Sequence, residues 1–89
     1  MVEITNTLEA FNGAKYVATE RARDVTYAVV WYGGTTYSIY AEYPSDPTIR
    51  EIDVRTVMDS KGMALPEAEA EEQCWEILES VLADNGVEV

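Results

Sequence analysis

Residues 25–43 read VTYAVVWYGGTTYSIYAEY, two runs of β-branched and aromatic residues that are interrupted by Gly33-Gly34. Such runs favour strands, and a two-residue hairpin turn needs positive φ angles, which glycine adopts without strain. The stretch therefore predicts a β-hairpin over residues 25–43. With the two glycines as the turn, Val30 lies opposite Tyr37 and Ala28 opposite Ile39, which makes one face of the hairpin mostly apolar.

The other face of this hairpin would carry Trp31, Tyr27 and Tyr40 together with polar residues, a mixture that suits partial exposure. Because side chains alternate along a strand, a shift of one residue in the pairing would exchange the two faces.

The chain that follows the hairpin predicts a third strand. Residues 44–47, PSDP, are typical of a loop because two prolines interrupt regular hydrogen bonding. Residues 50–57, REIDVRTV, alternate Ile52, Val54 and Thr56 with charged residues, which indicates a strand at about 50–57. A helix that begins at Asp46-Pro47 is the alternative. Residues 59–62, DSKG, are typical of a turn.

Residues 5–23, before the hairpin, allow two interpretations. Asn6 and Glu9 have the spacing of a capping box, which would open a helix that contains Leu8 and Phe11, although Gly13 interrupts it. Alternatively, residues 14–22 form a strand that precedes the hairpin.

The last third of the chain predicts a helix at about 66–84, within PEAEAEEQCWEILESVLADNG. Pro66 suits the first helical position, and Asn85-Gly86 is a typical stop. At 100° per residue, one side of this helix is apolar and should pack on the sheet. We therefore predict an α+β fold with a small antiparallel sheet and a C-terminal helix, in a single domain over residues 1–89. The apolar stripe consists of Ala70, Cys74, Ile77, Leu78, Val81 and Leu82.

The opposite side of the predicted helix is acidic. Like charges three or four residues apart destabilise a helix by about 0.2–0.5 kcal/mol per pair. Asp84 also lies toward the negative end of the helix dipole, where a cation would be favourable. Helix stability therefore does not account for this side of the helix. A solvated face that keeps the protein soluble is the alternative to a binding surface. The acidic stripe consists of Glu69, Glu72, Glu76 and Glu79, with Trp75 at its border.

The net charge of −11 is concentrated in this part of the chain. Residues 62–89 contain eight acidic residues and no basic one, which leaves a net charge of only −3 for residues 1–61. An acidic protein is repelled by nucleic acids and by anionic membranes, and it is attracted to basic proteins. We therefore expect the partner to be a basic protein surface, with no direct contact to nucleic acid or membrane.

In type, the chain resembles the small acidic anti-CRISPR and anti-restriction proteins of phages, which mimic nucleic acid. The resemblance rests on its length, a pI near 4.1, the α+β pattern and EAEAEEQCWEILESVLAD at residues 67–84, and it includes no diagnostic motif. It implies a stoichiometric inhibitor, located in the host cytoplasm, that occupies a basic surface of a nucleic-acid-handling complex. Because such proteins share little sequence with one another, no functional residue can be transferred by alignment. The geometry of the predicted helix instead indicates the partner-binding residues, which would be Glu69, Glu72, Glu76, Glu79 and Trp75.

Two other classes of protein stay open. A halophilic cytosolic protein would carry acidic side chains on every exposed surface. A non-enzymatic interaction or structural module would bind through the aromatic hairpin face that contains Trp31, Tyr27 and Tyr40.

The sequence predicts no catalytic, cofactor-binding or metal-binding residues. The chain has no His, so neither a Ser-His nor a Cys-His pair can be built. Cys74 is the sole cysteine, and we expect it to be a small buried hydrophobe. The chain contains neither the EF-hand spacing nor a Gly-rich phosphate loop. No apolar run approaches the roughly 20 residues of a membrane span, and no signal peptide is evident, so we expect a cytoplasmic protein.

Overall fold

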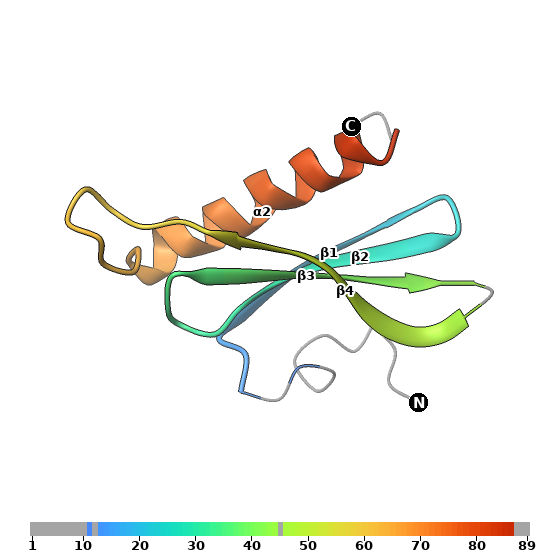
Figure 1. The fold of residues 1–89 in the computed structure, drawn as a ribbon, viewed down its shortest axis with the longest axis horizontal. Coiled ribbons are helices and arrows are strands. Elements are labelled where there is room, and N and C mark those ends of the chain that lie inside the picture. The colour runs from blue at the N-terminus through green and yellow to red at the C-terminus, as the bar shows by residue number, and fades with distance from the viewer. Residues whose placement is uncertain (1–10, 12, 45, 87–89) are drawn as a thin grey trace.

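The computed structural model describes residues 11, 13–44 and 46–86, which form a four-stranded antiparallel sheet with one helix packed on one of its faces (Figure 1). The spatial order of the strands is the same as their order in the chain. The predicted α+β fold with a C-terminal helix is therefore confirmed. The elements are β1 (Tyr16–Ala22), β2 (Val25–Trp31), β3 (Thr36–Tyr43), β4 (Asp46–Thr56) and α2 (Glu67–Asp84).

β1 shows which of the two N-terminal interpretations holds for residues 14–22. This segment contains a strand, and β1 pairs with β2 from Tyr16 opposite Trp31 to Ala22 opposite Val25. Arg23 in the intervening turn has a φ of 58°, the left-handed conformation that a tight hairpin needs. The proposed capping residues Asn6 and Glu9 lie outside the described residues.

The pairing of β2 with β3 differs by one residue from the predicted register. Val29 lies opposite Ile39, and Trp31 lies opposite Tyr37. The cause is a connection longer than the predicted two-residue turn, because only Gly33 of the two glycines has a positive φ, at 103°. The Trp31 indole Nε1 donates a hydrogen bond to the Gly34 carbonyl at 2.8 Å and so holds this longer connection in place.

The shift in register places the large side chains of β2 under the helix. Tyr27, Val29 and Trp31 face α2, whereas the prediction had put Ala28 and Val30 on the main apolar face. All six residues of the predicted helix stripe are buried against this face, so that prediction is confirmed. The sheet contributes Ala18, Tyr27, Val29, Trp31, Tyr37, Ile39 and Ala41 to this main core.

The opposite face of the sheet carries a second, smaller apolar cluster. Ala28 and Val30 are fully buried there together with Phe11, whose ring centroid lies 4.7 Å from that of Tyr40. Both faces of the central strands are therefore covered, which explains why β2 is apolar along nearly its whole length.

β4 is longer than the strand predicted at about 50–57. It begins at Asp46, so the alternative of a helix beginning there is wrong, and the loop predicted at residues 44–47 does not include Asp46 and Pro47. Its pairing with β3 shifts between Asp53, opposite Ile39, and Glu51, opposite Tyr40, which leaves Ile52 as an extra residue in a β-bulge. The bulge interrupts the predicted alternation, and Ile52 and Val54 consequently do not share a face.

The chain between β4 and α2 contains the predicted turn at residues 59–62. The Asp59 carboxylate Oδ1 accepts hydrogen bonds from the backbone N–H groups of Lys61 and Met63, at 2.8 and 2.9 Å. Pro66 is the N-cap residue of α2 and not its first helical residue, so the helix begins one residue later than predicted. Within the described residues, no helix has the length and apolar character needed to span a membrane.

Candidate protein-binding surface on the helix

The outer face of α2 carries the predicted acidic stripe. Glu69, Glu72, Glu76 and Glu79 are all exposed, while the opposite side of the helix is buried on the sheet. Because an α-helix rises 1.5 Å per residue, successive carboxylates of the stripe are spaced by about 4.5–6 Å along the helix axis. The helix therefore presents them as a regular row on a rigid support.

None of these four carboxylates forms an ion pair with any described residue. The helix itself contains no Lys or Arg, and so it cannot balance the row internally. Exposed basic side chains do occur elsewhere, on Arg21 and Arg23 near the β1–β2 turn and on Lys61 in the turn at residues 59–62. The mutual repulsion between the four carboxylates is therefore not offset by an ion pair with any described basic side chain.

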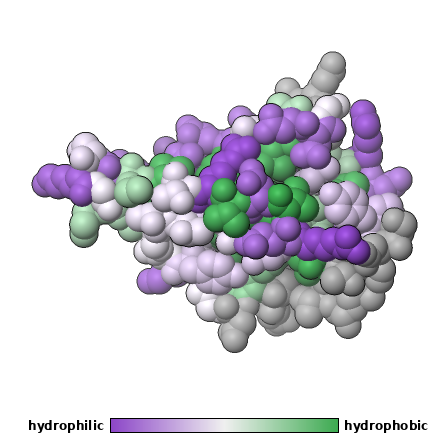
Figure 2. Space-filling model, in the orientation of Figure 1, coloured by the Kyte–Doolittle hydropathy of each residue, from purple (hydrophilic) through white to green (hydrophobic). Residues whose placement is uncertain are grey.

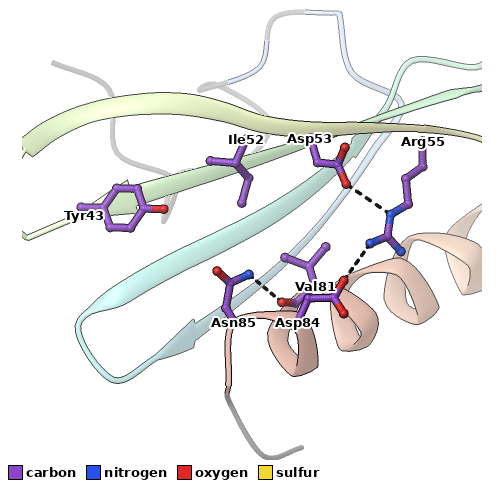
Figure 3. A pocket seen from close by; sticks show the side chains of 7 residues that line it. All are labelled: Tyr43, Ile52, Asp53, Arg55, Val81, Asp84 and Asn85. Carbon is purple, nitrogen blue, oxygen red and sulfur yellow. Dashed lines mark hydrogen bonds and ion pairs between the residues drawn. The ribbon is translucent and has the colours of Figure 1, made fainter.

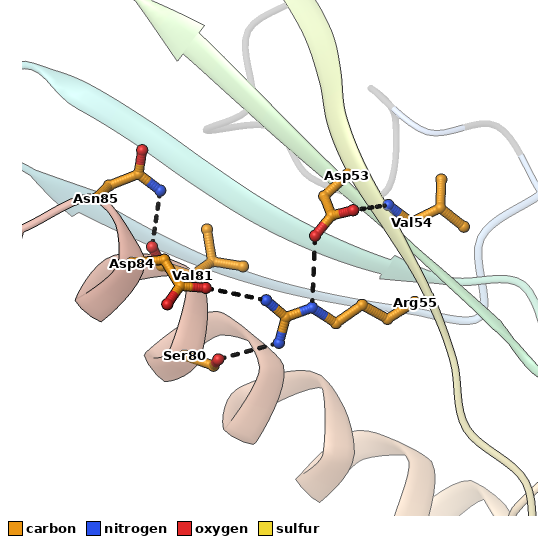
Figure 4. A network of polar contacts seen from close by, with 7 residues as sticks. All are labelled: Asp53, Val54, Arg55, Ser80, Val81, Asp84 and Asn85. Carbon is orange, nitrogen blue, oxygen red and sulfur yellow. Dashed lines mark hydrogen bonds and ion pairs between the residues drawn. The ribbon is translucent and has the colours of Figure 1, made fainter.

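One acidic side chain of the helix, that of Asp84, is neutralised by a residue that the sequence pattern did not indicate. Arg55 of β4 reaches α2, where its Nη2 lies 3.3 Å from Asp84 Oδ2 and its Nη1 donates to Ser80 Oγ at 3.0 Å (Figure 4). Its Nε also lies 3.5 Å from Asp53 Oδ2. The negative end of the helix dipole is thus balanced by a cation from another element, so Asp84 has a structural role.

Trp75 lies at the border between the buried and the acidic sides of α2, as predicted. Its side chain is 42% exposed, and the indole Nε1 donates a hydrogen bond to the Tyr16 hydroxyl of β1 at 2.8 Å. This bond fixes the ring beside Glu72 and Glu79, which are three residues before it and four residues after it. An aromatic ring beside carboxylates suits an arginine guanidinium, which binds both groups.

Cys74 is fully buried in the main core, as expected for a small hydrophobe. Burial, with a smaller contribution from the nearby Glu71 carboxylate, raises the pKa of its thiol to about 12. The thiolate is the reactive form of cysteine, and it is scarce near neutral pH at such a pKa. Burial and the raised pKa therefore both favour the protonated, unreactive form of the thiol.

The aromatic hairpin face does not exist as a surface. Trp31 and Tyr27 are only 4% and 5% exposed because the corrected register places them under α2. Tyr40 lies on the opposite face of the sheet, beside Phe11. The proposed binding surface of these three aromatic residues is therefore wrong.

A cavity of about 210 Å³ lies between β4 and the C-terminal part of α2 (Figure 3). The Arg55 side chain lies at one side of it and bonds to both of the aspartates in its wall (Figure 3). The Asn85 amide at its base donates a hydrogen bond to the Val81 carbonyl at 2.7 Å. The polar groups of the wall thus largely bond to one another. The lining residues are Tyr43, Ile52, Asp53, Arg55, Val81, Asp84 and Asn85.

The described residues contain no group of three or more His, Cys, Asp or Glu side chains that could hold a metal ion. Comparisons with known proteins found no family model that matches the chain, and no similar curated protein or solved structure. The charge and geometry of α2 are therefore the features that bear on function.

Proposed function

We propose that the protein binds a basic protein surface through the acidic stripe of α2, with Trp75 at the border of the interface. Through this contact it acts as a stoichiometric inhibitor of a nucleic-acid-handling complex, whose phosphate-binding surface it occupies. The supporting observation is a row of four exposed carboxylates that have no ion-pair partner among the described residues.

The spacing of the stripe supports this mimicry. Phosphates of duplex DNA follow one another at about 3.4 Å of axis along each strand, and the carboxylates of α2 follow at about 4.5–6 Å. Arginine and lysine side chains that bind phosphate oxygens can bind carboxylate oxygens in the same way. A partner built for phosphates would therefore meet a sparser row of similar acceptors.

The charge distribution also favours this function over that of a halophilic cytosolic protein. A halophilic protein is expected to carry acidic groups on every exposed surface, but Arg21 and Arg23 are exposed at one end of the sheet and Lys61 is exposed in the turn beyond the other end. The excess of negative charge lies on one element, as an electrostatically steered contact requires.

The test is a titration against purified CRISPR effector complexes and restriction enzymes, each bound to a fluorescent DNA duplex. We expect one complex to lose its duplex at a one-to-one ratio of added protein. Replacement of Glu72, Glu76 and Glu79 by Gln should abolish this inhibition at physiological salt. The matched control replaces Glu20 and Glu51 by Gln and Asp24 by Asn, which removes the same charge from exposed positions outside the helix.

Three outcomes would contradict the proposal. If the protein displaces DNA from none of the complexes, the proposed inhibitory role is wrong. Unchanged inhibition by the helix variant would remove the stripe as the contact. Equal losses in the helix variant and the matched control would show that only net charge matters.

A further inference from the structure

β4 forms one edge of the sheet, and no described strand pairs with its outer side. Two apolar side chains of this strand are exposed, Ile52 by 37% and Val54 by 47%. Figure 2 shows hydrophobic surface in the middle of this side of the molecule, bordered by hydrophilic side chains. An exposed edge strand with apolar residues is a template for pairing with a further strand.

The backbone of β4 indicates where such pairing would be centred. Val57 N–H donates to the Thr35 carbonyl at 2.9 Å, on the β3 side of the strand. Because hydrogen-bonding directions alternate along a strand, the N–H groups of Asp53 and Arg55 also point to β3, and that of Val54 points outward. Val54 N–H donates instead to the exposed carboxylate Oδ1 of Asp53, at 2.8 Å. By the same alternation the N–H of Thr56 points outward, so the open side of β4 presents the backbone of both Val54 and Thr56.

Val54 lies between an acidic and a basic residue, so a twofold axis at Val54 would place opposite charges of two copies next to each other. In an antiparallel pair centred on Val54, Asp53 lies opposite Arg55 of a second copy, and Arg55 lies opposite the second Asp53. Val54 then pairs with itself. An axis at Ile52 would place Glu51 opposite Asp53, two like charges, and an axis at Thr56 would create no charge pair. The sequence thus favours one register.

We propose that β4 pairs with β4 of a second copy of this chain around a twofold axis at Val54, so that the two sheets form one continuous sheet. The axis is perpendicular to the sheet, so both helices lie on the same face. Each helix packs mainly over β1 and β2, and only its last turns reach β4, through Arg55. This proposal does not depend on the proposed function.

A disulfide test reads this register directly. In a hydrogen-bonded antiparallel pair the two Cα atoms lie about 5.5 Å apart, which suits a disulfide, so Val54→Cys should cross-link to itself under mild oxidation. The control is Thr56→Cys, since its two copies would be separated by about 13 Å along the strands. The native Cys74 is buried and does not compete. Equal cross-linking of the two variants, or of neither, would overturn the proposal.

Sedimentation equilibrium tests the assembly without cysteine. We expect the parent protein to associate reversibly to a dimer in about 0.5 M NaCl, which screens the repulsion between two acidic chains. Val54→Pro removes the outward N–H and should be a folded monomer, while Val54→Thr keeps the N–H and should dimerise. If the proline variant is unfolded by circular dichroism, Val54→Lys replaces it, since two ammonium groups would meet at the axis.

Two sedimentation results would contradict the dimer. One is a parent protein that stays monomeric up to about 1 mM, well above the Kd of a specific contact. The other is a folded proline or lysine variant that associates as strongly as the parent. The two copies would then contact each other through a surface other than β4.

Discussion

Arg55 and Asp84 lie 29 residues apart in the sequence, yet their side chains meet with an Nη2–Oδ2 distance of 3.3 Å. The contact connects the edge strand β4 to the last turn of α2. It places a positive charge near the helix C-terminus, where the last turn of the helix itself has no basic residue.

Loss of this contact should destabilise the protein. Because the pair is partly exposed, we expect Arg55→Gln to lower the free energy of unfolding by about 1 kcal/mol in urea denaturation. Arg21→Gln removes the same charge from an exposed position and should change stability much less. Equal effects of the two substitutions would show that net charge, and not the contact with Asp84, is responsible.

Relief of the repulsion along the acidic stripe should stabilise the protein. Replacement of Glu72 and Glu76 by Gln removes three like-charge pairs, each of which costs about 0.2–0.5 kcal/mol. The Tm should therefore rise by a few degrees at low salt, since about 1 kcal/mol shifts the Tm of a domain of this size by roughly 4–8 °C. The gain should shrink in 1 M NaCl. A fall in Tm would reveal a structural partner for these carboxylates.

The Tyr37 hydroxyl is buried in the main core and has no hydrogen-bond partner among the residues that the structure describes. A buried polar group without a partner is unfavourable by about 1–3 kcal/mol. Tyr37→Phe keeps the ring and removes the hydroxyl, so we expect the free energy of unfolding to increase by about 1 kcal/mol. A clear decrease in chemical denaturation would mean that the hydroxyl bonds to a partner, such as an internal water.

Stability should fall at alkaline pH because of Cys74. Its pKa is raised to about 12 in the folded protein, so the thiol stays protonated there while the unfolded chain, with an ordinary pKa near 9, releases the proton. The contribution of Cys74 is thus full below about pH 9 and declines by up to about 1.4 kcal/mol per pH unit toward pH 12. The difference in unfolding free energy between the parent and Cys74→Ala, measured at several pH values, gives this contribution. The titration of the tyrosines is common to both proteins and cancels in the difference. If this difference does not change with pH, ionisation of Cys74 does not cause the loss of stability.

The helix could be predicted in detail because its information is local. The spacing of Ala70, Cys74, Ile77 and Leu78 defines a buried side, and the exposure of Glu72 on the opposite side follows from the same periodicity. Nothing outside the segment had to be known.

The sheet register and the Arg55 contact depend on information that the local pattern lacks. Both faces of β2 are buried, so alternation could not show which one meets α2, and the length of the turn at Gly33 decided it. The bulge at Ile52 follows from the pairing with β3, and it has no signal in β4 alone. Arg55 finds Asp84 only because the fold brings β4 beside the end of the helix.

The two tryptophans give the protein an intrinsic fluorescence reporter. Trp31 is buried in the core, whereas Trp75 is partly exposed to solvent and lies beside the acidic stripe. Trp31→Phe would leave a single emitter at the border of the proposed interface. Its spectrum should move to shorter wavelength, and acrylamide should quench it less, when another protein covers the outer side of α2. Binding could thus be followed without any label.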